Sequence, residues 1–417
     1  MKQLKSLSIY GFTIFFNAAI SFVTFSLVTH HLTEVDYGII NLYSATIVFL
    51  SPFIAIGVQF ILGVDFFKMS EDVFSRHFTN AISIPVISCF LFTLLILVGH
   101  SYIENFLRID FFFALLIPFA CLLTIYNDVI LTLIRDKGNH RLFSLYSISK
   151  NIVEIALTIL FVVMLSLKWQ GRLSSSIAVL CLMLAVAIFL VKRWKLYTGV
   201  FNKDAIKKIF ITGLPFVPER LAIFVLGFSD RFFINFYEGT GDVGLYSAGA
   251  QIAMIVSMGT LTLSNVFYPT IYKSLAQTEV DYAKLRKIIL VYIGIASFIA
   301  LSVILATPLF FKYFIGPRFN PGKQYAIFLT IGLFFWAVYN VFIAFLLSLR
   351  KNNLIMSISI FGMIVSLSIN LFFVRWFGAL GATYTSMIVH FIMAVTTIYF
   401  VNKYYSLSRI FGFKNLM

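Results

Sequence analysis

The sequence has few charged residues and no long polar segment. Asp, Glu, Lys and Arg make up 12% of its 417 residues, whereas hydrophobic residues make up 60%. A soluble domain usually carries about 25% charged residues, so this chain lacks the polar side chains needed to cover a surface that faces water. The longest polar connection, at about residues 192–209, is too short to hold a soluble domain. We therefore expect a lipid bilayer to be the solvent of this protein.

Cysteine is scarce, and the common catalytic motifs are missing. The three cysteines, Cys89, Cys121 and Cys181, lie in apolar segments without the spacing of metal ligands, so we interpret them as core residues. The sequence contains no nucleotide-binding phosphate loop, no HExxH, no CxxC and no GxSxG. It therefore predicts no catalytic residue, no metal and no cofactor, and it does not predict an enzyme.

What the sequence does contain is a series of long apolar runs. A membrane-spanning helix needs about 20 mostly apolar residues, and six segments in each half meet this requirement. They are 7–28, 39–62, 79–99, 111–134, 145–167, 175–191, 210–236, 244–268, 288–311, 325–349, 354–374 and 380–401. The pattern predicts an all-α integral membrane protein with about twelve transmembrane helices. The first run is longer than the core of a signal peptide, so we expect it to be retained.

Positive charge is in excess, with a formal net charge of +15. If the N-terminus is cytoplasmic, 22 of the 32 Lys and Arg residues fall on the inner side of the membrane and 7 on the outer side. This asymmetry follows the positive-inside rule, so we predict a multi-pass protein with both termini in the cytoplasm. Topology then explains the charge without a nucleic-acid partner. The basic segment at about 192–209 suits contact with anionic membrane lipids.

The two halves of the sequence resemble each other. "DYGIINLYSA" begins at Asp36 and "DVGLYSAGAQ" begins at Asp242, each just before a long apolar run. Because each half has six predicted helices, the two copies would enter the membrane in the same direction and be related by an axis along the membrane normal. We expect an N-terminal lobe over 1–205, which includes the start of the 192–209 linker, and a C-terminal lobe over 206–417.

Four segments in this order carry a resemblance to a known family. They are "HHLTEVDYGIINLY", "GLPFVPERLAIFVLGFSDRFFI", "GDVGLYSAGAQIA" and "FGALGATYTSMIVH". Together with the arrangement of six plus six helices, they make nearly the whole chain similar to flippases of the multidrug/oligosaccharidyl-lipid/polysaccharide exporter superfamily. Within that superfamily, the chain most closely resembles the O-antigen repeat-unit flippases.

The resemblance implies a fold, a substrate and a location. The fold would be two six-helix lobes related by pseudo-two-fold symmetry in a V, working by alternating access. The substrate would be an undecaprenyl-pyrophosphate-linked oligosaccharide, such as an O-antigen unit, flipped from the cytoplasmic to the periplasmic leaflet of the bacterial inner membrane during lipopolysaccharide biosynthesis. A polysaccharide polymerase and a chain-length regulator would be further partners.

Seven charged residues interrupt the predicted helices. A charge at the bilayer centre costs about 2.5–3.5 kcal/mol on insertion scales, so such residues usually face a protein interior or a wet cavity. Within 210–236, Glu219 and Asp230 are three helical turns apart and would share one face, and the two arginines that follow them would share a neighbouring face. The seven residues are Asp128, Lys150, Glu154, Glu219, Arg220, Asp230 and Arg231.

The residue types indicate two roles. Arginine offers paired donors to phosphate oxygens, so we interpret Arg220, Arg231 and Lys150 as binding the substrate pyrophosphate. The carboxylates of Glu219, Asp230, Glu154 and Asp128 are candidates for lining the cavity or for coupling H⁺ or Na⁺ to transport. Arg231 could instead reach the headgroups, and Lys150 could pair with Glu154 four residues later. His390 is interpreted as a buried imidazole with a satisfied hydrogen bond.

Three other functions fit parts of the pattern. A flippase for a peptidoglycan lipid precursor and a multidrug antiporter share the implied fold, although the antiporter is expected to favour acidic cavity residues. An O-antigen polymerase would be expected to have a long outer loop with arginine motifs. The longest predicted outer loop is only about 312–324, which favours a transporter.

Overall fold

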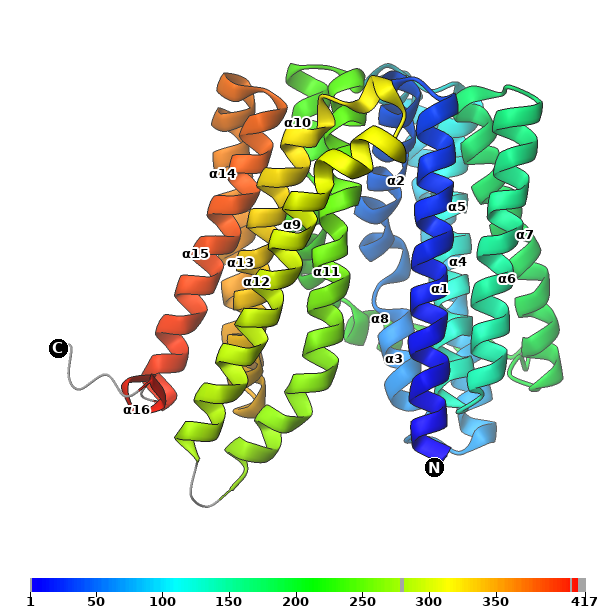
Figure 1. The fold of residues 1–417 in the computed structure, drawn as a ribbon. Coiled ribbons are helices and arrows are strands. Elements are labelled where there is room, and N and C mark those ends of the chain that lie inside the picture. Colours follow the sequence, from blue (N-terminus) through cyan, green and yellow to red (C-terminus); the bar gives the residue numbers. More distant parts are fainter. Residues whose placement is uncertain (1, 278–280, 406, 412–417) are drawn as a thin grey trace. The chain divides into compact units, whose positions relative to one another are not determined.

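The chain folds into helices joined by short turns. The structure, a computed structural model, describes residues 2–277, 281–405 and 407–411, and these ranges contain no β-strand (Figure 1). Eleven of the described helices are long and apolar enough to cross a membrane, and the number is twelve when Lys203–Gly213 and Phe216–Phe228, a pair bent by 44°, are counted as one span. The predicted all-α, multi-pass membrane architecture with about twelve spans is therefore confirmed.

The chain divides into two compact units, Met1–Leu221 and Ala222–Met417. The first contains α1 (Lys2–His31), α2 (Glu34–Ala55), α3 (Val58–Asp65), α4 (Glu71–Leu107), α5 (Phe111–Asp136), α6 (His140–Thr158), the π-helix η1 (Ile159–Met164), α7 (Lys168–Arg193) and α8 (Lys203–Gly213). Helix α9 (Phe216–Phe228) crosses the boundary. The second contains α10 (Asp230–Tyr237), α11 (Thr240–Leu275), α12 (Tyr282–Tyr313), the 3₁₀-helix η2 (Pro317–Phe319), α13 (Gly322–Ser348), α14 (Asn352–Phe377), α15 (Ala379–Tyr405) and α16 (Leu407–Phe411).

The boundary between the units lies at Leu221, beyond the expected position at residue 205. The reason is that the segment after α7 is tied to the first unit. The Asn202 backbone N–H donates to Asn80 Oδ1 on α4 at 2.7 Å, and α8 packs on α3 and α4. The basic stretch around 192–209 thus belongs with the first unit, and the chain leaves that unit within α9.

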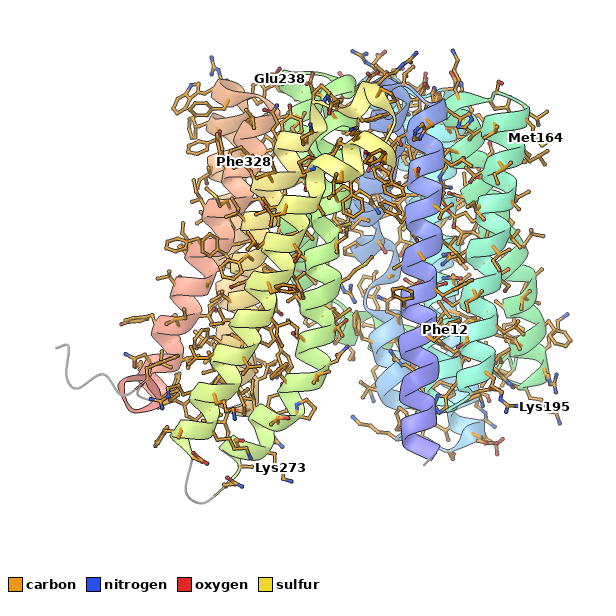
Figure 2. All side chains as sticks on the ribbon, in the orientation of Figure 1. Phe12, Met164, Lys195, Glu238, Lys273 and Phe328 are labelled. Atoms are coloured by element: carbon orange, nitrogen blue, oxygen red, sulfur yellow. The ribbon has the colours of Figure 1, made fainter. Side chains whose placement is uncertain are left out.

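Apolar side chains cover the outward faces of the helices. Phe12 on α1 is 59% exposed and Met164 at the end of η1 is 71% exposed (Figure 2). In water such exposure would be costly, whereas hydrocarbon solvates these groups. Serine, threonine and asparagine side chains instead bond within or between helices, as Asn17 Nδ2 does to Ser147 Oγ at 2.7 Å across the α1–α6 contact. This distribution is that of a protein whose exterior faces lipid.

Two predicted helices are broken, and their breaks meet. The run 39–62 stops at Ile56 and Gly57, whose φ angles of 43° and 67° are left-handed. The run 210–236 is interrupted at residues 214–215 and again at Ser229, so the prediction of one continuous helix there is wrong. The first of these interruptions contains Pro215, which cannot donate to a helical carbonyl. At Gly213 an added Cβ would lie 1.9 Å from the Ile56 carbonyl oxygen, so the two bends fit only because this residue is glycine.

The internal repeat marks equivalent helix starts in the two units. Asp36 is the third residue of α2 and Asp242 is the third residue of α11. Asp36 closes a capping box with Thr33, because its carboxylate accepts from the Thr33 backbone N–H at 3.1 Å and the Thr33 hydroxyl accepts from the Asp36 backbone N–H at 3.1 Å. An acidic residue in the first turn also complements the positive end of the helix dipole. The repeated Asp-x-Gly pattern is therefore explained by helix initiation.

Candidate functional site

In the second unit, Asp230 and Arg231 form a closed pair. The break at Ser229 places Asp230 at the first position of α10, where its side chain folds over its own backbone. Asp230 Oδ1 accepts from the Arg231 backbone N–H at 2.9 Å and from Arg231 Nη1 at 3.2 Å. Adjacent residues in a helix do not normally face each other, but here the Asp230 carboxylate turns back onto the first turn of α10 and meets both the backbone N–H and the guanidinium of Arg231. The prediction that these two residues share faces with Glu219 and Arg220 assumed one continuous helix over 210–236, which the structure does not contain.

Neighbouring groups complete the coordination of this pair. Arg231 Nη1 also donates to the Gly227 carbonyl at 3.0 Å, and the Tyr246 hydroxyl on α11 donates to Asp230 Oδ2. The guanidinium carbon lies 5.1 Å from the ring centre of Phe228 and 5.8 Å from that of Tyr246. Arg231 is only 5% exposed, so it is held inside the unit rather than extended toward the lipid headgroups.

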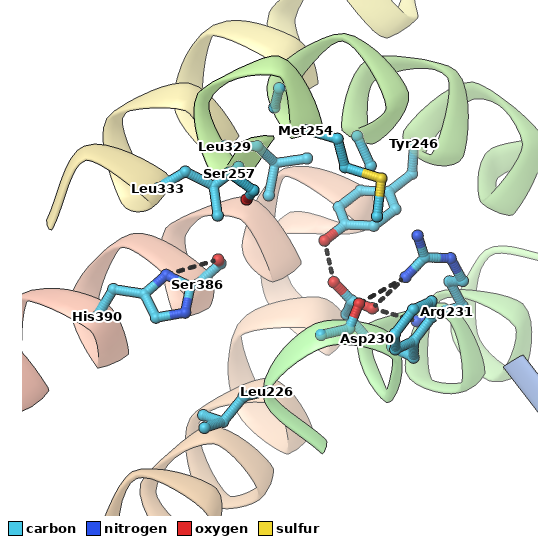
Figure 3. A pocket seen from close by; sticks show the side chains of 14 residues that line it. Leu226, Asp230, Arg231, Tyr246, Met254, Ser257, Leu329, Leu333, Ser386 and His390 are labelled. Carbon is cyan, nitrogen blue, oxygen red and sulfur yellow. Dashed lines mark hydrogen bonds and ion pairs between the residues drawn. The ribbon is translucent and has the colours of Figure 1, made fainter. Parts of the chain in front are cut away.

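A cavity of about 140 Å³ opens beside the pair (Figure 3). His390 and Ser386 on α15 lie across it from Asp230 and Arg231, and Ser257 on α11 lies along its wall. His390 is 5% exposed, and its Nδ1 is 3.5 Å from Ser386 Oγ. That distance is at the limit of a hydrogen bond. The predicted buried imidazole is therefore present, and it borders a cavity.

In the first unit, Arg220 has a different environment. Its guanidinium carbon lies 4.3 Å from the ring centre of Phe60 on α3, and that ring stacks on Phe216 at 5.3 Å. Ring and cation therefore sit at the junction of the two helix breaks. Arg220 and Lys150 are both within electrostatic range of Asp128. These three side chains come from α9, α6 and α5, and among the described residues none of them forms an ion pair with another.

The carboxylates proposed for ion coupling differ in their partners. Glu154 Oε1 accepts from Arg172 Nη2 at 2.8 Å and from Ser176 Oγ at 3.1 Å, both on α7, so its ion pair is with Arg172 and not with Lys150. Glu219 is exposed and belongs to none of the ion pairs among the described residues. Asp128 is also exposed, and its Oδ1 accepts a long hydrogen bond of 3.4 Å from Asn127 Nδ2.

The sequence did not indicate that several residues of these two sites would be functional neighbours. Phe60 and Phe216 are two of 49 phenylalanines, and nothing distinguishes them before the breaks bring them together. Arg172 follows an apolar run and reads as a loop residue. Tyr246 belongs to the repeated "DVGLYSAGAQ" segment, which is the one feature that could have drawn attention to it. Its contact with Asp230 depends on the packing of α10 against α11.

Comparisons with known proteins agree with this architecture. Residues 4–275 match the family described as polysaccharide biosynthesis protein. The Lsg locus putative protein 1 of Haemophilus influenzae is 28% identical over 171 residues, which cover 41% of this chain and 43% of that protein. The chain thus matches less than half the length of this curated relative.

Two solved structures share the fold. The lipid II flippase MurJ in an inward closed conformation has a TM-score of 0.75 at 12% identity, covering 96% of this chain and 89% of that one. An inward-facing multidrug resistance MATE family transporter of the MOP superfamily has a TM-score of 0.73 at 14% identity, covering 95% and 96%. At such low identity these matches establish the fold alone, and they confirm the predicted exporter fold.

Proposed function

Because the chain belongs to the polysaccharide biosynthesis protein family, we propose that it flips an undecaprenyl-pyrophosphate-linked oligosaccharide, an O-antigen or similar repeat unit, across the bacterial inner membrane. The family and the shared fold support a flippase-type transporter. The movement runs from the cytoplasmic to the periplasmic leaflet by alternating access of two lobes. Both termini face the cytoplasm in this arrangement.

The proposal rests on Arg220, which we call the open cation because it has no ion-pair partner among the described residues. A pyrophosphate has at least two negative charges that must be compensated inside the bilayer. Arg220 is stacked on an aromatic ring, and neither Arg220 nor Lys150 belongs to an ion pair among the described residues. Their N–H donors are therefore available to phosphate oxygens, and arginine can present two of them in parallel. Arg231 is already paired with Asp230, so it contributes less directly to binding the pyrophosphate.

Asp128 is the best candidate for ion coupling. Its carboxylate competes with a bound pyrophosphate for the same two cations, Lys150 and Arg220. Protonation of Asp128, or its capture of Na⁺, would release these cations to the substrate, so ion and substrate binding are linked. Glu219 is a second exposed carboxylate for this role. Glu154 and Asp230 each form an ion pair with an arginine, and we propose that these two carboxylates stabilise the helix packing.

The same chemistry leaves one close alternative. A peptidoglycan lipid precursor also carries a pyrophosphate, and the fold shared with the lipid II flippase supports this second candidate. A drug antiporter that moves cations is disfavoured, because Lys150 and Arg220 outnumber Asp128 in the first-unit cluster. An O-antigen polymerase is disfavoured by the family and by the short connection between α12 and α13. A polymerase and a chain-length regulator act downstream of the proposed step.

Accumulation of substrate in a deletion strain tests the proposal. The gene is deleted, and the leaflet location of the polyprenyl-linked pool is measured in spheroplasts and in inverted vesicles. We expect an assembled repeat unit to accumulate on the cytoplasmic side. Wild type and the control Lys312→Ala, which removes an exposed cation stacked on Tyr313, should clear it. Arg220→Ala and Lys150→Ala should not.

Each other outcome points to a different function. Accumulation of a peptidoglycan precursor identifies the close alternative. Repeat units that reach the periplasm without being polymerised indicate a polymerase. An unchanged lipid-linked pool with altered drug sensitivity indicates an antiporter, and it contradicts the proposal.

A further inference from the structure

The cavity in the second unit combines polar groups on two sides with apolar walls. Asp230, Arg231 and Tyr246 form one polar side, and Ser386 with His390 forms the opposite one (Figure 3). The walls between them are apolar and come from α9, α11 and α13. They consist of Leu226, Gly227, Phe228, Ala250, Ala253, Met254, Leu329 and Leu333.

Opposite charges within the cavity cancel. The carboxylate of Asp230 and the guanidinium of Arg231 are in direct contact, and both side chains are largely buried. The other polar lining groups are hydroxyls and an imidazole. A strongly charged ligand would leave this environment without a counter-charge, because burying an unpaired charge is costly. The cavity therefore suits a ligand that is polar and uncharged.

Hydrogen-bonding capacity is left over in the lining. The Ser257 hydroxyl has no hydrogen-bond partner among the described residues. The contact between His390 Nδ1 and Ser386 Oγ, at 3.5 Å, is weak enough to be exchanged for a better one. Arginine has five N–H donors, and both side-chain bonds of Arg231 use Nη1. Donors and acceptors are thus spread around one small volume.

A metal cation fits this cavity less well. It would have to displace the buried guanidinium from Asp230 and the Tyr246 hydroxyl from the same carboxylate. Within the described part of the chain, no group of three His, Cys, Asp or Glu side chains could hold a metal ion. A pyranose ring has the required features, because its hydroxyls bond around the edge while its C–H faces pack on apolar side chains.

We propose that this cavity binds one sugar ring of the transported oligosaccharide. The inference rests on the proposed function. The hydroxyls of Ser257 and Ser386 and the imidazole of His390 bond the ring hydroxyls, and Leu329 and Leu333 pack against a ring face. The cavity of the second unit is therefore assigned to the sugar part of the substrate.

Binding of two matched probes tests this assignment. The full chain is purified into lipid nanodiscs. One probe is the oligosaccharide-linked lipid pool extracted from the deletion strain, and the other is undecaprenyl pyrophosphate without sugar. Dissociation constants are measured for wild type and for Ser257→Leu, Ser257→Ala and the control Thr262→Leu. The control adds bulk on the same helix at an exposed position whose hydroxyl bonds only the Met258 carbonyl.

We expect wild type to bind the sugar-bearing probe more tightly. Ser257→Ala should weaken that probe about fivefold, the effect of one net hydrogen bond, and Ser257→Leu should weaken it by about tenfold or more because leucine fills the cavity. The sugar-free probe should bind all variants equally, and Thr262→Leu should match wild type for both probes. Ser257→Ala keeps the test valid if the leucine variant does not fold.

Three results would overturn the inference. If wild type binds the two probes equally, the cavity is not a sugar site, and the proposed function is not affected. Equal weakening of both probes by the Ser257 variants indicates a structural role. The third result concerns the fluorescence of Trp336, whose ring lies 5.3 Å from that of His390. If this fluorescence changes with Na⁺, and the change is lost in Ser257→Leu while probe binding stays the same, the cavity binds a cation. Failure of wild type to bind either probe contradicts the proposed function itself.

Discussion

Arg220 and Arg231 each follow an acidic residue, yet the structure uses them differently. Asp230 begins helix α10, so its side chain reaches the backbone and guanidinium of Arg231. Glu219 lies inside the first turn of α9, where consecutive side chains point about 100° apart, and it stays exposed while Arg220 stacks on Phe60. One sequence pattern therefore gives a closed ion pair in the second unit and an open cation in the first. The two arginines differ in what they contact, which is the Asp230 carboxylate for Arg231 and the Phe60 ring for Arg220.

The largest effect on stability is expected from opening the closed pair. Arg231→Ala leaves Asp230 buried without its counter-charge, which typically costs about 3–5 kcal/mol of unfolding free energy. Thermal unfolding in detergent should show a much lower midpoint than wild type. The double variant Asp230→Asn/Arg231→Ala should lose less than the sum of the two single variants, because it leaves no unpaired charge. Additive losses would show that the pair is not coupled.

The bend that presents Arg220 should be sensitive to a single methyl group. Gly213→Ala places a Cβ against the Ile56 carbonyl and is expected to destabilise the fold by about 1–3 kcal/mol through overpacking. Gly227→Ala is the matched control, since a Cβ there meets no atom within 4 Å. This control should be neutral, or more stable by up to about 1 kcal/mol. If Gly213→Ala and Gly227→Ala are equally stable, the close contact at Gly213 is not needed for the bend that positions Arg220.

The ion pair of Glu154 tests whether the first unit also contains a closed pair. Glu154→Gln weakens the bonds from Arg172 and Ser176 and should cost about 1–2 kcal/mol, near the lower end for hydrogen bonds to charged groups. Chemical unfolding of the purified protein measures the loss. Flipping at different pH values should keep its wild-type profile in this variant and lose its pH dependence in Asp128→Asn. A changed profile in Glu154→Gln alone would move the coupling role to that residue.

The smallest effect on stability is expected at the open cation. Arg220→Gln removes a cation–π contact that contributes about 0.5–1 kcal/mol, so its unfolding midpoint should stay close to that of wild type. Flipping of the lipid-linked oligosaccharide in proteoliposomes should nevertheless be lost. Arg220→Lys should retain part of the activity, because it keeps the charge and loses the paired donors. Normal flipping by Arg220→Gln would show that the open cation does not serve the substrate.

The spans could be predicted from the sequence because lipid solvation requires only length and hydrophobicity. All twelve apolar runs correspond to helices, although 39–62 is divided between two helices and 210–236 among three. Pro215 is a helix-breaking signal in the sequence, but Gly57, Gly213 and Ser229 are ordinary residues within apolar runs, so the other breaks could not be predicted. Their significance comes from what packs against them, such as the Ile56 carbonyl at Gly213. Partners were missed for the same reason, as the pairing of Glu154 with Arg172 shows.

The sequence by itself determined the solvent, the number of spans, the internal repeat and the set of intramembrane charges. These properties are sums or periods of local composition, and each apolar run must form a helix to satisfy its backbone in lipid. Only the tertiary structure decided which charges are closed and which are open. That choice depends on helix breaks and on side chains such as Phe60 and Tyr246, which come from distant parts of the sequence. The energy of a buried charge is set by what surrounds it in space.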